Sequence, residues 1–337
     1  MSSLLYIGNK LSKSGNNITS IETLGSFLKN EGFTVHMASS KKNKILRLVD
    51  MLWTTLRYGP KVDVVLIDTY STQNFYFAVS VGQLCRWLKV PYIPILRGGN
   101  LPHRLNKSPG LCRKLFDGAR QNIAPSMYLF NAFKSEGYTR LNYIPNTIEI
   151  NEYAFQLRKN IKAKLLWVRS FSDIYNPSLA LKVVERLQKQ EIPVELTMVG
   201  PEVQDNLKNC KKEAKEKNLP INFTGRLDKK DWIALSTSYD IFINTTNFDN
   251  TPVSVIEAMA LGLPVISTDV GGMPYLIEHR ETGILVKPND ETAFIEEIIK
   301  LMEHPAATEK LSLSARAKVE SFNWAQVREQ WFSVLKE

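Results

Sequence analysis

Short apolar segments alternate with amphipathic segments along almost the whole chain of 337 residues. Residues 4–7, 62–67 and 91–97 are apolar runs of strand length. Residues 74–88, between the last two, carry apolar side chains at helical spacing. Strands that alternate with helices form βα units, whose strands lie parallel in one sheet. The chain is therefore expected to be an α/β protein built on doubly wound parallel sheets.

The same alternation starts again in the second half of the chain. Residues 147–163 are polar, basic and without strong periodicity, which is typical of a linker. After them come further apolar runs of strand length, at residues 165–168, 194–199, 221–224, 240–244 and 264–267. This pattern predicts two Rossmann-like domains, residues 1–155 and 163–315, with a cleft between them. Ligands of such folds bind at the carboxyl ends of the strands, beside helix N-termini.

The charge is shared unevenly between the two halves. Residues 1–160 hold 21 Lys and Arg against 9 Asp and Glu, whereas residues 161–337 hold 22 against 25. A basic first half favours an anionic partner, such as a membrane leaflet or a phosphorylated substrate. A scattered, solvated basic surface is the alternative. No stretch interleaves aromatic with basic residues as proteins that bind single-stranded nucleic acid do, so nucleic acid is not expected as a partner.

The cysteines and the lengths of the apolar runs indicate where in the cell the protein is expected. Cys85, Cys112 and Cys210 are far apart and show no His spacing typical of zinc, so packed thiols and no metal site are expected. No apolar run approaches the roughly 18 residues of a membrane span, and a signal peptide is not expected, because the first residues lack a basic region followed by a long apolar core. We therefore expect a cytoplasmic protein, with peripheral association at the inner face of the membrane through its basic half.

The segment NTTNFDNTPVSVIEAMALGLPVIST, residues 244–268, places two carboxylates around a helix start. Pro suits the first helical position and Thr is a good N-cap, so a helix is expected from about Pro252, capped by Thr251. Glu257 then lies inside the helix and Asp249 in the loop that enters it. Because a helix start gathers free N–H groups and the positive end of the dipole, an anion can bind there beside the two acids. The other interpretation is a capped core helix whose acids face water.

Three stretches of the second half together resemble a known family. They are FTGRLDKKDWIALSTSYDIFINTT, DNTPVSVIEAMALGLPVISTDVGGMPYLI and TGILVKPND. Their order and spacing are similar to those of GT4-class retaining glycosyltransferases, which have the two-domain GT-B architecture. The resemblance covers most of the chain and is strongest over residues 165–286. It also implies a C-terminal helix, at about residues 320–337 and containing FNWAQVREQW, that crosses back to the first domain.

The resemblance implies donor-binding roles in the second half. Glu257 stands where relatives bind the ribose hydroxyls, and Asp249 stands where they place a glutamate at the reacting carbon of the sugar. Arg169 is implied on the phosphates, whereas Tyr175 stands where relatives have a phosphate-binding lysine. The other positions implied at the diphosphate, the sugar and the base are Asn250, Thr251, Val253, Gly271, Gly272, Arg226 and Leu227.

In the first half the resemblance implies a glycine loop and a residue at the end of a strand. Gly15, Asn16 and Asn17 fit the loop, where a glycine lets the backbone approach a ligand. Arg97 stands where relatives often have a histidine, and the resemblance implies that it is a catalytic residue that lines the reacting sugar. An arginine there can clamp a phosphate, but it cannot act as a general base because it stays protonated. His103, the histidine nearest to Arg97 in the sequence, is an acceptor-side candidate, with a surface or packing role as the alternative.

The resemblance implies an enzyme that moves a sugar from a nucleotide-sugar donor to an acceptor hydroxyl with retention. It implies no metal or other cofactor, because side chains and a helix dipole would meet the diphosphate charge. The implied acceptor is a saccharide or a lipid-linked saccharide, in the assembly of a bacterial-type polysaccharide, lipopolysaccharide or glycolipid.

Two other functions stay open. Tyr175 and Arg97, at positions where relatives carry Lys and His, would also suit a nucleotide-sugar-binding scaffold without turnover. A sugar-nucleotide epimerase of GT-B form would share the fold and the nucleotide site. A dinucleotide-dependent enzyme is not expected, because YIGNKLSKSG lacks the G-x-G-x-x-G turn that such a site requires.

Overall fold

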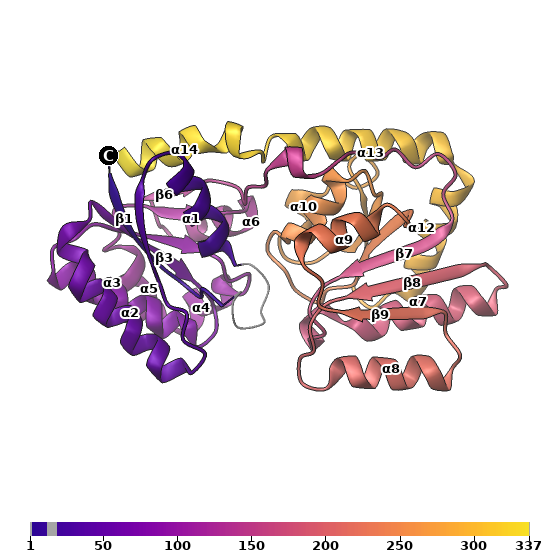
Figure 1. Ribbon diagram of the computed structural model, residues 1–337, viewed down its shortest axis with the longest axis horizontal. Helices are drawn as coiled ribbons and strands as arrows, with labels where there is room; N and C mark the ends of the chain where they lie inside the picture. Colours follow the sequence, from indigo (N-terminus) through magenta and orange to yellow (C-terminus); the bar gives the residue numbers. More distant parts are fainter. Residues whose placement is uncertain (1, 12–18, 337) are drawn as a thin grey trace. The chain divides into compact units, whose positions relative to one another are not determined.

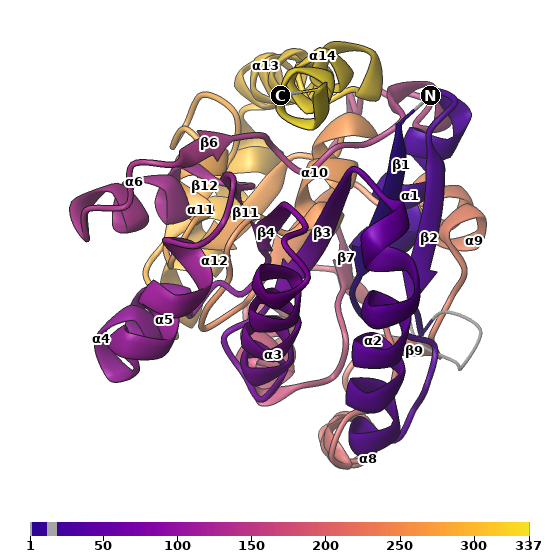
Figure 2. The same ribbon diagram turned by 90° about the vertical axis from the view of Figure 1, so that its left-hand side faces the viewer.

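The computed structural model describes residues 2–11 and 19–336. The chain forms two compact units, Met1–Thr147 with Trp324–Glu337, and Ile148–Asn323. Each unit is built on one six-stranded parallel sheet with helices on both of its faces (Figures 1 and 2). The doubly wound α/β fold expected from the alternating pattern is therefore confirmed.

The first unit has the strand order β2-β1-β3-β4-β5-β6, with all neighbouring strands parallel. Its elements are β1 (Ser3–Ile7), α1 (Ser20–Asn30), β2 (Thr34–Ala38), α2 (Lys44–Tyr58), η2 (Gly59–Lys61), β3 (Val64–Thr69), α3 (Asn74–Trp87), β4 (Tyr92–Leu96), α4 (Leu101–Lys107), α5 (Pro109–Phe116), β5 (Asn122–Ala124), α6 (Met127–Ser135), β6 (Leu141–Tyr143) and α14 (Trp324–Lys336). The order reverses between β1 and β3, the switch point where doubly wound sheets bind ligands. Gly15, Asn16 and Asn17 lie outside the described residues.

Helix α14 ends the chain but belongs to the first unit. The ring of Trp324 stacks on Phe27 of α1 with a centroid distance of 4.9 Å. The Trp324 indole N–H also donates a hydrogen bond of 2.9 Å to Glu31. The C-terminal segment therefore packs against the N-terminal unit, which is where the resemblance places it.

The second unit has the strand order β12-β11-β10-β7-β8-β9, again entirely parallel. Its elements are η3 (Ile150–Glu152), β7 (Ala163–Val168), η4 (Asp173–Tyr175), α7 (Pro177–Lys189), β8 (Val194–Val199), α8 (Asn206–Glu216), β9 (Ile221–Gly225), α9 (Lys229–Ser236), β10 (Ile241–Asn244), α10 (Val253–Ala260), β11 (Val265–Thr268), α11 (Met273–Leu276), β12 (Ile284–Val286), α12 (Glu291–Glu303) and α13 (Pro305–Glu320). This is the Rossmann order, and its switch point lies between β7 and β10.

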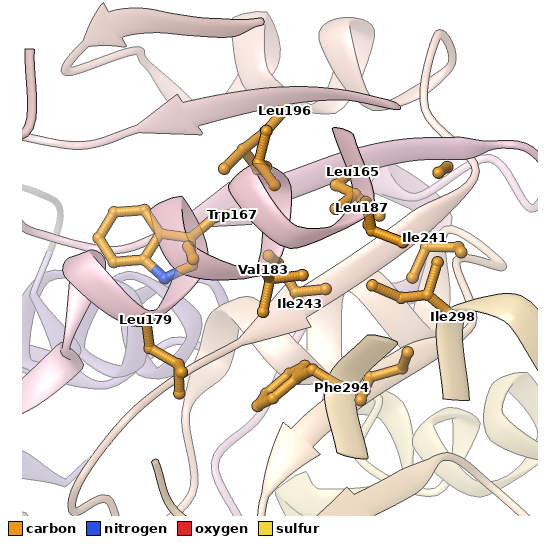
Figure 3. Close-up of a cluster of buried hydrophobic side chains, with 14 of the residues drawn as sticks. Leu165, Trp167, Leu179, Val183, Leu187, Leu196, Ile241, Ile243, Phe294 and Ile298 are labelled. Carbon is orange, nitrogen blue, oxygen red and sulfur yellow. The ribbon is translucent and has the colours of Figure 1, made fainter. Parts of the chain in front are cut away.

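A dense apolar core fixes β7 and β10 in the second unit (Figure 3). Trp167 of β7 is fully buried in it. Leu179, Val183 and Leu187 follow each other at four-residue spacing on α7, so they form one stripe that faces the sheet. Phe294 of α12 closes the same cluster. The two central strands are thus rigid supports for whatever follows their carboxyl ends.

The polar segment 147–163 is packed on the second unit over most of its length. Tyr153 in this segment is 1% exposed and Arg158 is 5% exposed. The Arg158 guanidinium donates to the carbonyl oxygens of Ser236 and Leu261, at the C-terminal ends of α9 and α10. Burial lowers the pKa of Arg158 to about 10, but the cation suits the negative ends of two helix dipoles. The segment therefore serves as a structural part of the second unit.

The three cysteines are free and buried, as expected for packed thiols. Burial raises the pKa of the Cys85 thiol to about 12, which keeps it protonated and unreactive. The cysteines and the other described His, Asp and Glu residues form no group of three that could hold a metal ion. None of the helices within residues 2–11 and 19–336 combines the length and the apolar character that a membrane crossing requires.

Candidate functional site

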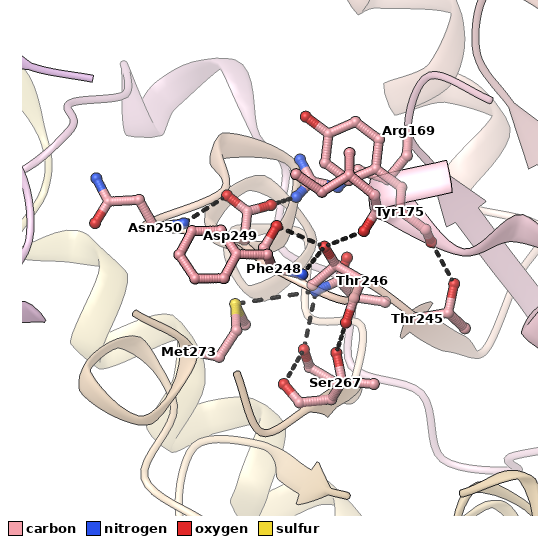
Figure 4. Close-up of polar contacts among 12 residues, drawn as sticks. Arg169, Tyr175, Thr245, Thr246, Phe248, Asp249, Asn250, Ser267 and Met273 are labelled. Atoms are coloured by element: carbon pink, nitrogen blue, oxygen red, sulfur yellow. Dashed lines mark hydrogen bonds and ion pairs between the residues drawn. The ribbon is translucent and has the colours of Figure 1, made fainter. Parts of the chain in front are cut away.

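The carboxyl ends of β7 and β10 bring two of the candidate residues together. The strands pair in parallel, with Leu165 opposite Ile241. Arg169 directly follows β7, and Asp249 lies in the loop that follows β10. Their side chains form an ion pair and are 12% and 16% exposed (Figure 4). A cation and an anion proposed for donor binding thus meet at the switch point of the second sheet.

Tyr175 covers Arg169 from the other side. Its ring centroid lies 4.3 Å from the guanidinium carbon of Arg169, a cation–π contact. Asp249 in turn accepts a hydrogen bond of 2.8 Å at Oδ1 from the backbone N–H of Asn250. At the position where the resemblance implies a phosphate-binding lysine, this chain therefore has an aromatic ring that packs on Arg169.

Two threonines hold the loop after β10 in position. The Trp167 indole N–H donates 3.0 Å to Oγ1 of Thr245, and that hydroxyl donates 2.9 Å to the carbonyl oxygen of Asn176. The Thr246 hydroxyl donates 3.1 Å to the carbonyl oxygen of Ile174 (Figure 4). The loop that carries Asp249 is thereby tied to the loop after β7. Neither threonine was a candidate from the sequence, because the spacing of residues along the chain does not show which carbonyl oxygens their hydroxyls donate to.

Gly271 and Gly272 let a second loop approach Asp249 closely. A Cβ on Gly271 would lie 2.1 Å from the carbonyl oxygen of Asp249, and one on Gly272 would lie 1.8 Å from that of Asn250. Gly271 also has a φ of +54°, and the N–H of Gly272 donates 3.0 Å to the Asp249 carbonyl. The absence of side chains at Gly271 and Gly272 thus lets their backbone pack directly against the backbone of Asp249 and Asn250. A contact with sugar or phosphate stays a prediction.

Helix α10 begins one residue later than the sequence suggested. Pro252 has a ψ of 124°, so it is the N-cap, and the helix runs from Val253 to Ala260. The expectation of Thr251 as cap and Pro252 as first helical residue is wrong, because an extended Pro252 already presents its carbonyl to the N–H groups of Val255 and Ile256. Proline has no side-chain acceptor, so the N-cap residue makes no side-chain hydrogen bond to α10. The N-terminal end of α10 carries the positive end of the helix dipole, which favours an anion.

Glu257 is buried inside α10, with 8% of its surface exposed. Its Oε1 accepts a hydrogen bond of 2.5 Å from the Tyr153 hydroxyl and lies 3.8 Å from Nζ of Lys229. Burial raises the pKa of Glu257 to about 6, although Tyr153 and Lys229 both lower it. The interpretation in which the acids of this segment face water is wrong for Glu257.

Sequence reasoning missed the partners of Glu257. Tyr153 lies in the segment taken as a linker, and Lys229 is the first residue of α9. Lys229 also pairs with Glu152 at 2.8 Å and lies 4.8 Å from the Tyr153 ring centroid. A buried acid on an apolar helix requires donors, which is a signal that partners exist. It does not say where in the chain they are.

The other donor-side candidates lie on the loops around this centre. Asn250 is buried, Thr251 is half-buried and Val253 is exposed. Arg226 and Leu227 follow β9. Arg226 lies 3.5 Å from a carboxylate oxygen of Asp228, while Leu227 packs on the core beside α10. Their contact with a nucleotide base stays a prediction.

Arg97 lies in a buried polar cluster of the first unit. It follows β4, and its Nε donates 3.0 Å to Asp68, its Nη1 2.6 Å to Asn146 and its Nη2 3.2 Å to the Tyr6 hydroxyl. Burial raises the pKa of Asp68, although the Arg97 charge lowers it. His103 is exposed on α4. A phosphate clamp by Arg97 stays a prediction, and it would have to use the second N–H of Nη1 or Nη2.

Comparisons with known proteins bear on the family and the fold of this chain. A family model described as "Glycosyl transferases group 1" matches residues 149–318. An uncharacterized glycosyltransferase of Haemophilus influenzae is 30% identical over 157 residues, 46% of this chain and 44% of that relative. The match therefore spans less than half the length of this curated relative.

Two solved structures cover this chain completely. Anabaena HepE in complex with UDP and glucose has a TM-score of 0.79 at 17% identity, with both chains fully covered. Sucrose-phosphate synthase from Thermosynechococcus elongatus has a TM-score of 0.83 at 15% identity and is covered to 98%. These likenesses confirm the GT-B fold.

Proposed function

The chain belongs to the glycosyl transferases group 1 family, and on this premise we propose that it is a GT4-class hexosyltransferase. It moves a sugar from a nucleotide-sugar donor to an acceptor hydroxyl with retention at the anomeric carbon. The observation that carries this proposal is the meeting of Arg169, Asp249 and the N-terminal end of α10 at one sheet edge. A diphosphate is the ligand whose charge a guanidinium and a helix N-terminus together neutralise.

The donor is held along α10 in this proposal. The diphosphate accepts hydrogen bonds from the first N–H groups of the helix, at Val253, and from Arg169. The ribose hydroxyls donate to Glu257, whose pKa of about 6 leaves it ionised at neutral pH. The base lies against Arg226 and Leu227. Support comes from the burial of Glu257, because a carboxylate kept in an apolar helix is costly for stability alone.

Transfer breaks the bond between the anomeric carbon and a phosphate oxygen. The acceptor oxygen forms the new bond on the same face of the sugar, and the acceptor proton leaves with the departing diphosphate. Arg169 and the α10 dipole stabilise the charge that develops on that group. Asp249 lies beside the reacting carbon in this proposal. When the donor binds, Arg169 gives up its ion pair with Asp249 and pairs with a phosphate oxygen of the donor instead. The proposal requires no metal and no further cofactor.

The acceptor is a saccharide or a lipid-linked saccharide, in the assembly of a bacterial-type polysaccharide, lipopolysaccharide or glycolipid. The basic first half supports an acceptor at the anionic cytoplasmic face of a membrane, with the protein associated peripherally. Arg97 is the proposed catalytic residue of the first unit, and His103 is proposed on the acceptor side, together with the loop at Gly15, Asn16 and Asn17. Nucleic acid is not a partner in this proposal.

The first test is donor binding by thermal shift. The panel contains UDP, GDP, ADP and CMP with their common sugar conjugates, starting from UDP-glucose because HepE was solved with UDP and glucose. A ligand at 100 times its Kd stabilises by about 2.7 kcal/mol, a shift of several degrees. Glu257→Ala and Arg169→Ala should abolish the shift. Retention is then checked by the anomeric configuration of the product.

Glu297→Ala is the matched control for Glu257→Ala. Glu297 is also a buried helical glutamate with cationic partners, Arg280 and Lys300. It lies on α12 and has no place in the proposed site, so its variant should keep the full shift. If no ligand of the panel shifts the melting temperature of the wild type, the proposal is wrong.

A binding scaffold is the second candidate, and the Tyr175 ring on Arg169 favours it. The ring fills the position of a second phosphate-binding cation, which weakens stabilisation of the leaving group. A scaffold would show the thermal shift without transfer to any acceptor. Conversion of the donor in the absence of an acceptor would instead indicate an epimerase.

A further inference from the structure

Helix α2 turns apolar side chains to the solvent. The large apolar residues that are at least half exposed on this helix are Ile45, Leu46, Val49, Trp53 and Leu56, called the α2 face below. Ile45 is 74% exposed and Trp53 is 54% exposed. The opposite side of α2, which packs on the first unit, carries Arg47, Met51 and Thr55. A surface helix of a globular protein normally has the reverse arrangement, with its apolar stripe inward.

The exposed residues form one continuous stripe. Ile45, Val49 and Trp53 follow each other at four-residue spacing, so they lie one above another along the helix. Leu56 continues the stripe. Figures 1 and 2 show α2 beside α3 on one side of the first sheet. Single exposed apolar residues need no explanation, whereas a contiguous patch marks a binding surface.

Cations surround the α2 face at both ends. Lys41, Lys42 and Lys44 are exposed at its N-terminal end. Arg57 is exposed at the other end, with its guanidinium carbon 5.1 Å from the centroid of the Trp53 ring. Asp50 is the acid within the helix, and it accepts a hydrogen bond of 2.5 Å from Ser39. An apolar stripe with a tryptophan and flanking cations is the composition of a helix that lies in the interface of an anionic membrane.

We propose that the α2 face docks the first unit on an anionic lipid surface, with its apolar side chains among the lipid headgroups and acyl chains. The cations at both ends then lie at the level of the phosphates. Helix α2 begins at the edge of the first sheet where β1, β3 and β4 end, next to the proposed acceptor side. The docking deepens the peripheral association of the proposed function, and access to a lipid-linked acceptor rests on that function, whereas the choice of the α2 face as the docking surface rests on its exposed residues alone.

The test is co-sedimentation with vesicles of phosphatidylglycerol and phosphatidylcholine, without donor or acceptor. The wild type should bind these vesicles, and less so as the salt concentration rises. Val49→Ser with Trp53→Ser should weaken binding at least about tenfold, because two side chains no longer leave water. Lys41→Ser with Lys42→Ser should weaken it about fivefold for each charge. Because the α2 face is exposed, these variants should stay folded, and their thermal shift with the donor should equal that of the wild type.

Leu313→Ser is the matched control. Leu313 lies on α13 of the second unit and is 50% exposed, so its replacement removes an exposed apolar side chain outside the α2 face and should leave vesicle binding unchanged. Equal binding of the wild type to pure phosphatidylcholine, or unchanged binding of Val49→Ser with Trp53→Ser, would overturn the proposal. So would a dimer that the same double variant converts to a monomer, since a second copy would then cover the α2 face. Loss of vesicle binding with an intact donor shift separates failure of docking from failure of the proposed function.

Discussion

The Tyr153 hydroxyl donates a hydrogen bond of 2.5 Å to Glu257, although the two residues are 104 positions apart in the chain. Tyr153 belongs to the segment that enters the second unit, and Glu257 lies in the middle of α10. Both are buried. The proposed ribose-binding carboxylate is therefore held by the segment that the sequence suggested was only a linker.

Replacing Tyr153 by Phe should destabilise the protein and disturb nucleotide binding. The variant leaves Glu257 buried with Lys229 alone, and an unsatisfied buried acceptor costs about 1–3 kcal/mol. Because the tyrosine hydrogen bond lowers the pKa of Glu257, its loss should also raise that pKa further. Urea unfolding measures the stability, and titration with the nucleotide measures the affinity.

Tyr138→Phe is the control for this prediction. Tyr138 is also buried, 7% exposed, and packs against Phe116 and Phe133. Its hydroxyl makes no hydrogen bond within the described part of the chain, so the free energy of unfolding should change little. Equal losses in Tyr138→Phe and Tyr153→Phe would show that the bond to Glu257 contributes nothing specific.

Replacing Glu257 by Gln should stabilise the protein at neutral pH. The pKa of Glu257 is raised to about 6 from its ordinary value of 4.5. The folded state therefore binds the proton more tightly between pH 4.5 and 6, and the free energy of unfolding falls as pH rises through this window. Glutamine does not ionise and can still accept the Tyr153 hydrogen bond. The variant should match the wild type near pH 4.5 and exceed it by about 2 kcal/mol at pH 7.

Denaturant unfolding of both proteins from pH 4.5 to 7.5 checks this prediction. Nucleotide affinity should move in the opposite direction, because an amide is a weaker acceptor for ribose hydroxyls than a carboxylate. A stability difference that stays constant over the whole pH range would contradict the raised pKa. A gain in stability with a loss of binding would indicate that the acid is kept for function.

The alternation of strands and helices was sufficient to predict the fold. Residues 4–7, 165–168 and 240–244 are strands within one or two residues of their expected bounds, because buried parallel strands are apolar on both faces and flanked by turn residues. Pro252 shows why helix ends are harder to place. Its fixed φ suits both the N-cap and the first helical position, and only ψ, which the tertiary contacts set, decides between them.

The candidate site was predictable only in part. Arg169 and Asp249 were both named from the sequence, yet their ion pair depends on β7 and β10 being neighbours at the switch point. Tyr153 and Lys229 were missed because a long-range partner leaves no periodicity in the sequence. Arg97 was assigned to a phosphate, but its neighbours Asp68 and Tyr6 come from two other strands. Sequence patterns show where the strands are but not which strands are neighbours in the sheet. The side chains that meet at the ends of neighbouring strands therefore could not be predicted.

Replacing Asp249 by Asn should tighten nucleoside diphosphate binding while it lowers transfer. The carboxylate holds Arg169 in the free protein and would repel the incoming phosphates. Without it we expect UDP, or whichever diphosphate the panel selects, to bind about tenfold more tightly, a gain of about 1.4 kcal/mol. Arg169→Ala should have the opposite effect. Calorimetric titration of the two single variants and the double variant measures the coupling between the residues.

The double variant decides between two explanations. If Asp249 acts by occupying Arg169, then Asp249→Asn should gain nothing in the Arg169→Ala background. If it acts by its own charge on the phosphates, the gain should persist. Weaker diphosphate binding in the Asp249→Asn single variant would contradict the proposed exchange of partners.

Replacing Gly271 by Ala should impair the donor site. The new Cβ would lie 2.1 Å from the carbonyl oxygen of Asp249, so the loop that carries Asp249 must move. The φ of +54° adds a strain of about 1–2 kcal/mol for alanine. Gly137→Ala separates the two effects, because Gly137 has a φ of +87° but nothing within 4 Å of a Cβ. Both variants should lose stability by denaturant unfolding, whereas the thermal shift with the donor should be lost in Gly271→Ala alone. An intact donor shift in Gly271→Ala would mean that Asp249 need not be held where the glycine pair holds it.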